Sequence, residues 1–306
     1  MNSPVVPLPR SVIIPAFMLV SAILACNHVA ARIAFEHGAN VTTAVAVRSG
    51  GAAFFTMLML LATGVRIGLP QALRGKALVV GLCFALQSYC LYSAIAAIPV
   101  ALALLMFNIF PLILVLLAWA TGTERPGLRA FLVMPVALLG LAMALDVAGL
   151  TTGRGFDFAG RWTQIGVGVL WAIGAAFSMA AGMFLTNRWL GGMDGRLRTL
   201  TTMSVVAVVM IAKGAGTGSF ALPVDAIGWA ALAALTLLYT AGFTLMFVLL
   251  PRSGAASNTA ALNFEPIAAL ILAWLLLGQS IAPLQVVGAL VVIGAIIVLS
   301  LPKRAG

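Results

Sequence analysis

Two ionisable residues, Arg48 and Glu265, lie within long apolar stretches of the sequence. A charged side chain at the centre of a membrane-spanning helix costs about 2.5–3.5 kcal/mol on insertion scales, so such residues usually face a cavity or a partner. At the rise of an α-helix we expect Glu265 near mid-depth and Arg48 roughly 5 Å further outward, close enough to pair if their helices face each other. Such a pair is suited to binding a solute or handling a proton, because burial and a neighbouring arginine act oppositely on a carboxyl group's proton affinity. A structural ion pair is the alternative.

A polar stripe follows the helix expected over 255–277. At 100° per residue, Asn258, Asn263 and Glu265 fall within an arc of about 160°, and most other positions are Ala, Leu or Ile. Pro266 frees a backbone carbonyl one turn earlier, which marks a bend or leaves a ligand group. The stripe predicts a surface that faces a cavity, with hydrogen bonds between helices as the alternative for each asparagine.

Other polar and aromatic side chains lie on the faces of apolar stretches in which most neighbours are aliphatic. We expect them to contribute to the same cavity, although helix packing or a hydrogen bond between helices explains each one alone. These candidates are Asn27, His28, Gln87, Ser88, Tyr92, Asn108, Trp171, Ser178, Tyr239 and Thr240, together with Pro111 as a second helix-bending proline.

Motifs of common catalytic and metal sites are missing from the sequence. The three cysteines lie inside apolar stretches without CxxC or Cys/His spacing. There is no Walker A sequence, no His-Glu-x-x-His and no Gly-x-Ser-x-Gly. We therefore expect no enzyme activity, no bound metal, no cofactor and no direct use of ATP.

The composition indicates that lipid is the solvent for most of the chain. Hydrophobic residues make up 63% of the 306 residues and charged residues only 8%, whereas a soluble domain has about 25% charged residues. Runs such as 112–120 do not alternate between polar and apolar residues, which favours helices over a barrel. We expect ten transmembrane helices, over 11–34, 41–63, 77–97, 100–121, 129–148, 162–187, 197–213, 226–250, 255–277 and 284–301.

The lysines and arginines predict how these helices are inserted. If the N-terminus is cytoplasmic, twelve of the 17 Lys and Arg residues fall on the cytoplasmic side, four outside, and Arg48 within the membrane. This bias follows the positive-inside rule and places both termini in the cytoplasm. The net charge of +10 then reflects cationic loops, and no basic run or aromatic platform suggests a nucleic acid partner.

An internal repeat relates two of the expected helices. Residues 108–119 match residues 263–274 at five of twelve positions, including the Asn and Pro of each segment. The repeat unit is therefore five helices, and an odd number inverts the second copy. We expect inverted halves at 1–150 and 151–306, an arrangement typical of secondary transporters. Chance similarity between apolar helices is the alternative, but the loop after 108–119 carries two arginines and its equivalent, 278–283, carries none.

Four segments, taken in order, resemble one family. They are Asn27-His-Val-Ala-Ala-Arg32, Thr43-Ala-Val-Ala-Val-Arg48, Pro111 to Trp119, and Glu265-Pro266 to Leu277-Gly278. The chain resembles the EamA-type, ten-helix members of the drug/metabolite transporter superfamily. It departs from the family's Gly-Glu pattern at Thr123-Glu124 and Gly278-Gln279. The resemblance implies transport of small metabolites such as amino acids, or of toxic compounds, usually across a bacterial inner membrane.

These observations favour a secondary transporter, with export as the preferred direction, that works by alternating access at a cavity between the halves. Its partners would be a small-molecule substrate and the lipid bilayer, with protons as the candidate coupling ion and facilitation without coupling as the alternative. A membrane-embedded enzyme acting on lipid would need acid or base groups near an interface, for which Glu36, His37, Asp146 and Asp157 are candidates. A channel or structural membrane protein is the other alternative, although no charged ring or filter-like loop supports a channel.

Overall fold

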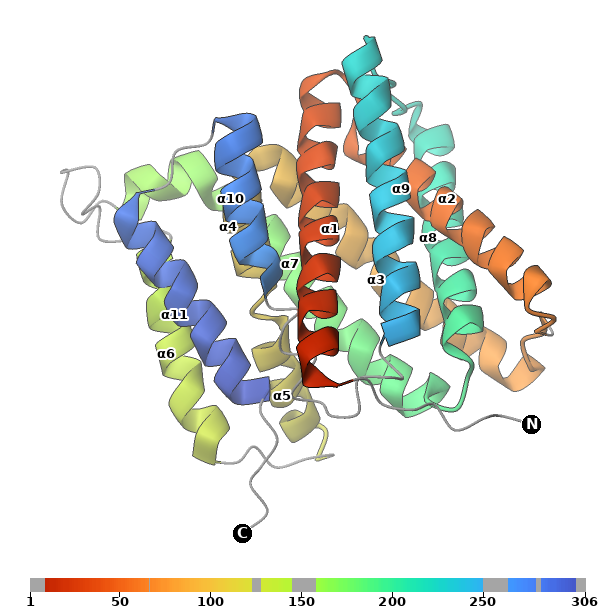
Figure 1. Ribbon diagram of the computed structural model, residues 1–306, viewed down its shortest axis with the longest axis horizontal. Helices are drawn as coiled ribbons and strands as arrows, with labels where there is room; N and C mark the ends of the chain where they lie inside the picture. Colours follow the sequence, from red (N-terminus) through yellow and green to blue (C-terminus); the bar gives the residue numbers. More distant parts are fainter. Residues whose placement is uncertain are drawn as a thin grey trace.

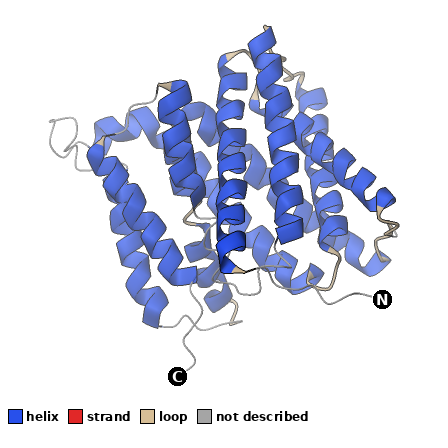
Figure 2. Cartoon of the chain, viewed as in Figure 1, coloured by secondary structure: helices blue, strands red, loops and turns tan. Residues whose placement is uncertain are grey.

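The computed structural model describes residues 9–65, 67–122, 128–144, 158–249, 264–278 and 282–300. Within these ranges the chain forms helices and no strand (Figures 1 and 2). The helices are α1 (Arg10–Glu36), α2 (Val41–Ala62), α3 (Gln71–Ala97), α4 (Val100–Phe107), α5 (Phe110–Ala120), α6 (Leu128–Ala144), α7 (Phe158–Leu190), α8 (Gly195–Thr217), α9 (Ala226–Leu249), α10 (Glu265–Leu277) and α11 (Pro283–Ser300).

The helices have the length and apolar surface that a bilayer requires. Among the described residues, seven helical stretches are long and apolar enough to cross a membrane, and one of these spans α4 and α5 together. Three shorter apolar helices, over Pro135–Ala144, Glu265–Leu277 and Pro283–Ala295, lie where the sequence predicts three further spans. Large apolar side chains such as Leu61 and Leu139 are more than half exposed. A multi-pass membrane protein is therefore confirmed, while the count of ten spans stays a prediction.

The expected single helix over 100–121 is interrupted in its middle. α4 ends at Phe107 and α5 begins at Phe110, one residue before Pro111. Proline has no N–H to donate to the carbonyl four residues earlier, and its ring clashes with that carbonyl, so the helix breaks at this point. The side-chain amide of Asn108 donates to the carbonyl of Leu104 at 2.8 Å and ends α4. The stretch Val100–Ala120 still forms one membrane-length span, as expected, with its interruption next to Pro111, the residue that the sequence marked as helix-bending.

The same Asn-x-x-Pro spacing recurs at the start of α10. This helix begins at Glu265, directly before Pro266, which lies in its first turn. The earlier part of the predicted helix, 255–263, lies outside the described residues. Both prolines therefore sit at the first turn of a short helix, which is the position where a missing backbone donor costs least.

Helix neighbours come in exchanged pairs across the chain. α1 packs against α9 and α10, and α7 packs against α3 and against α4 and α5. If α4 and α5 count as one span, each helix has a counterpart five spans away in the chain. The counterparts of α1, α9 and α10 are α7, α3 and the α4–α5 span, so the contacts of α1 are equivalent to the contacts of α7. α2 with α8, and α6 with α11, are pairs that this exchange leaves unchanged. α1 rises through the view of Figure 1 whereas α7 descends, so the two related helices run in opposite directions.

Candidate functional site

A cluster of buried polar side chains lies where α1, α2, α3, α9 and α10 meet. Asn27 of α1 is fully buried. Its side-chain amide donates to the carbonyl of Leu235 on α9 at 2.6 Å, and its carbonyl oxygen accepts a hydrogen bond from the hydroxyl of Tyr92 on α3 at 2.8 Å. Asn27 therefore joins three helices, and α9 comes from the second half of the chain.

The next residue along α1, His28, pairs with Glu265. The Nε2 atom of His28 lies 3.1 Å from Oε1 of Glu265, and their side chains are 8% and 21% exposed. Glu265 is in the first turn of α10, where the positive end of the helix dipole stabilises a carboxylate. Within the described part of the chain, Nδ1 of His28 is buried without a hydrogen-bond partner. Nδ1 can therefore make one further hydrogen bond, as donor or acceptor according to the tautomer of the ring.

Arg48 of α2 is buried among neutral partners. Its Nη2 atom donates to the hydroxyl of Ser88 on α3 at 2.9 Å, and that hydroxyl lies 3.3 Å from the side-chain oxygen of Gln87. The guanidinium carbon lies 4.8 Å from the ring centre of Tyr92 and 3.9 Å from that of Tyr239 on α9. The face of a tyrosine ring attracts a cation, and more strongly where water is excluded. These two rings therefore stabilise the charge of the guanidinium.

The hypothesis of a direct pair between Arg48 and Glu265 was wrong. Among the described residues, Glu265 pairs with His28, and Arg48 makes no ion pair. Tyr92 is a neighbour of both His28 and Arg48: its ring centre is 5.7 Å from that of His28, and its face contacts the guanidinium of Arg48. The reason is helix packing: α10 packs on α1, whereas Arg48 contacts Ser88 on α3 and Tyr239 on α9.

The remaining candidates are less closely connected to this cluster. Asn108 and Thr240 bond to carbonyls of their own helices, those of Leu104 and Thr236. Trp171 and Ser178 line a separate hollow of about 600 Å³ along α3 and α7, and Trp171 packs edge-on against Tyr89. Asn258 and Asn263 lie outside the described residues. That any of these residues contacts a substrate stays a prediction.

Sequence reasoning missed Lys213. The expected span ended at Lys213, which placed its charge in an outer loop, but α8 continues to Thr217 and ends at Gly218. The Lys213 ammonium instead donates to the hydroxyl of Thr42 on α2 at 3.1 Å and lies 4.8 Å from the ring centre of Tyr89 on α3. Helices often end at a glycine with a left-handed backbone, as α8 does at Gly218. This glycine is the signal in the sequence that could have corrected the boundary.

These features define a multi-pass helical membrane protein in which buried polar contacts join two related halves. A family model described as "EamA-like transporter family" matches the chain twice, over residues 12–145 and 166–301. The chain belongs to the EamA-like transporter family, whose members are transporters, and it is therefore a membrane transporter of the drug/metabolite type. The resemblance inferred from the sequence is confirmed.

A solved structure supports the same fold. The structure titled "Crystal structure of protein" is 18% identical in sequence and aligns over 95% of this chain and 96% of its own, with a TM-score of 0.56. At this level of identity the likeness concerns the arrangement of the helices alone.

Proposed function

We propose that this chain is a secondary transporter that moves a small metabolite or a toxic small molecule by alternating access. Its halves are 1–150 and 151–306, inserted in opposite orientations, and export across a bacterial inner membrane is the preferred direction. Both termini lie in the cytoplasm, following the distribution of lysine and arginine. The exchanged helix pairs and the opposite directions of α1 and α7 support the two-half arrangement.

The observation that carries the proposal is the position of the buried polar contacts. Asn27 bonds to a carbonyl of α9, His28 pairs with Glu265 of α10, and Arg48 stacks on Tyr239 of α9. Each contact joins a first-half helix to a second-half helix. Any movement of one half against the other must break or rearrange them, so a solute that competes for these groups biases the movement.

The pair of His28 and Glu265 is the proposed proton-handling group. A proton on Glu265 removes the charge that attracts His28, which weakens the link between α1 and α10. If the pair takes up a proton on one side of the membrane and releases it on the other, the opening and closing of this link couples proton movement to transport. Facilitated movement down the solute's own gradient is the alternative, and in that case the pair serves only to hold the halves together.

The test begins with a screen of cells with and without the protein, in which metabolite release and resistance to toxic compounds are measured. A compound identified there is then followed in proteoliposomes with and without a pH gradient. Glu265→Gln is expected to lower the transport rate at least about tenfold without changing the thermal unfolding midpoint by more than a few degrees.

Glu36→Gln is the matched control, because Glu36 also pairs with a basic residue of α1 but is about half exposed. It is expected to transport at the parent rate. Transport by Glu265→Gln at the parent rate contradicts the proposed role of the site. Rates indifferent to the pH gradient remove proton coupling. Turnover of lipid, or currents far above carrier rates, would favour the enzyme or the channel instead.

A further inference from the structure

Within the part of the chain that the structure describes, the buried guanidinium of Arg48 has no carboxylate partner, and this points to the charge of the solute. We infer that the transported solute carries a single carboxylate, which pairs with Arg48. The inference rests on the proposed transport function and adds the chemical class of its substrate.

Every carboxylate that the structure describes already has a basic partner elsewhere. Glu36 pairs with Arg32, Asp194 with Arg196, Asp225 with His37 and Glu265 with His28. Within the described residues, neither Arg48 nor Lys213 forms an ion pair. The buried Arg48 and the partly buried Lys213 therefore lack a counterion from these parts of the chain.

Arg48 cannot remove the imbalance by losing its proton, because a guanidinium stays charged in proteins. The residue is only 3% exposed, so water contributes little to stabilising the charge. One hydroxyl and two tyrosine rings compensate for part of it. Among the described residues, its Nε atom has no acceptor. A buried charge without a partner is strongly unfavourable, and an incoming anion that reaches Nε would relieve it.

Lys213 marks an approach to Arg48 for a negative charge. Lys213 bonds to Thr42, which precedes Arg48 by six residues, about 9 Å along α2. The aromatic ring beneath Lys213 belongs to Tyr89, the neighbour of Ser88, which accepts from Arg48. Both cations are therefore held between α2 and α3, one near the end of α8 and the other deeper.

The surroundings favour an organic monocarboxylate over an inorganic anion. The planar guanidinium matches the two oxygens of a carboxylate. The aromatic rings of Tyr92 and Tyr239 lie beside it, and the ring of Phe243 packs on Tyr239 with ring centres 4.4 Å apart. Such rings contact the apolar body of a solute but give nothing to a small hydrated ion. The carboxylate of Glu265, paired with His28 next to Tyr92, opposes a second negative charge.

The experiment compares carboxylates with their amides on the purified full-length chain in detergent. The probes are benzoate and benzamide, phenylacetate and phenylacetamide, and indole-3-acetate and indole-3-acetamide, with chloride and phosphate as inorganic anions. At least one carboxylate is expected to raise the thermal unfolding midpoint by about 2–4 °C, whereas its amide is not. Arg48→Gln should abolish this shift, and Arg48→Lys should keep part of it because the charge remains.

Arg32→Gln is the matched control, since Arg32 already has a carboxylate partner in Glu36, and it should keep the shift. The proposal is overturned if no carboxylate exceeds its amide, or if chloride or phosphate gives an equal shift. If Arg48→Gln does not fold, transport by Arg48→Lys is measured instead. Uptake of neutral compounds by this variant at the parent rate contradicts the inferred carboxylate but not the proposed transport function. Carboxylate binding without transport of any compound contradicts the proposed function instead.

Discussion

Two junctions at opposite ends of the helices occupy equivalent positions but are fastened differently. The first junction joins the turn between α1 and α2 (residues 37–40) to the turn between α8 and α9 (residues 218–225). The second junction joins the turn between α7 and α8 (residues 191–194) to the segment between α2 and α3 (residues 63–70). Exchanging each helix for its partner five spans away turns one junction into the other.

The first junction is closed by backbone hydrogen bonds. The N–H of Val224 donates to the carbonyl of His37 at 3.0 Å, and the N–H of Asn40 donates to the carbonyl of Ala221 at 3.3 Å. The Asn40 side chain also donates to the carbonyl of Ser219. His37 and Asp225 form an ion pair at 2.6 Å. Several bonds of different kinds must therefore break before this end opens.

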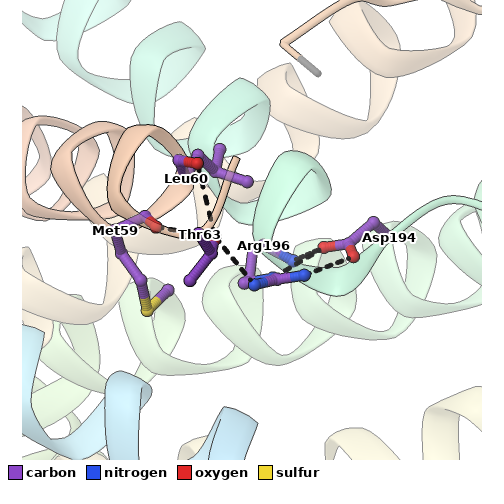
Figure 3. Close-up of polar contacts among 5 residues, drawn as sticks. All are labelled: Met59, Leu60, Thr63, Asp194 and Arg196. Carbon is purple, nitrogen blue, oxygen red and sulfur yellow. Dashed lines mark hydrogen bonds and ion pairs between the residues drawn. The ribbon is translucent and has the colours of Figure 1, made fainter. Parts of the chain in front are cut away.

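The second junction combines apolar packing of Leu69 against the cluster around Leu190 with a hydrogen bond from one long side chain (Figure 3). Arg196 donates to the hydroxyl of Thr63 at 3.1 Å, and the same guanidinium contacts the carboxylate of Asp194. The Thr63 hydroxyl donates within its own helix to the carbonyls of Met59 and Leu60. In the described residues, the bond between Arg196 and Thr63 is the hydrogen bond that crosses this junction. A cavity of about 390 Å³ lies beside it, between residues such as Pro70 and Met193.

The difference indicates which end opens more easily. The exposed side-chain hydrogen bond of the second junction contributes about 0–1 kcal/mol, whereas the paired backbone groups of the first junction give larger resistance. If the halves move as proposed, the second junction should separate first. In the predicted orientation that end faces the cytoplasm, where an exporter would load its solute.

The largest expected effect comes from adding a methyl group at two glycines with positive φ. Gly38 of the first junction has φ 96°, and an added Cβ would lie 3.0 Å from a methyl of Val224, whereas Gly64 of the second has φ 65° and its Cβ would meet nothing within 4 Å among the described residues. Gly38→Ala should cost about 2–3 kcal/mol and Gly64→Ala about 1–2 kcal/mol. Unfolding of each variant in mixed micelles measures the difference, and equal costs would refute the contrast in packing.

A smaller effect is expected from removing one polar side chain at each junction. Asn40 accepts from the N–H of Thr43, capping α2, and donates across the junction, so Asn40→Ala should cost about 1–2 kcal/mol. Thr63→Ala should cost about 0.5 kcal/mol because it removes an exposed contact. Hydrogen exchange at Val224 should accelerate in the first variant only. Faster exchange there in Thr63→Ala would show that the junctions are not independent.

The smallest effect concerns acidification. A hydrogen bond from the N–H of Gly228, together with His37, lowers the pKa of Asp225, and hydrogen bonding by Arg196 lowers the pKa of Asp194. A carboxyl group whose pKa is lowered by folding stabilises the folded chain at neutral pH, and this contribution is lost as the pH falls through the lowered value. Both junctions should therefore loosen below pH about 4.

Asp225→Asn should reduce the acid sensitivity of hydrogen exchange near His37, and Asp194→Asn should do the same near Thr63. Each variant serves as the control for the other, since the two carboxylates lie in different junctions. Unchanged acid sensitivity in both variants would assign the loosening to groups other than these.

Much of the architecture could be predicted from local features of the sequence. The apolar stretches marked the helices, the match between 108–119 and 263–274 marked the repeat, and four short segments in order marked the family. Boundaries were less certain, because a helix continues past a polar residue that finds a partner, as Lys213 does with Thr42. The break before Pro111 depended on one residue, and its chemistry indicated the bend but not the exact end of α4.

What the amino-acid sequence determined by itself is that Asn27, Arg48 and Glu265 had to find partners, because the cost of placing polar groups among apolar ones belongs to each residue. Which partners they found was decided only by the tertiary structure. Glu265 meets His28, and Arg48 meets Tyr239, across more than 190 residues of chain. These choices depend on how each helix is rotated against its neighbours, and that rotation is set by packing over the whole molecule rather than by any single segment.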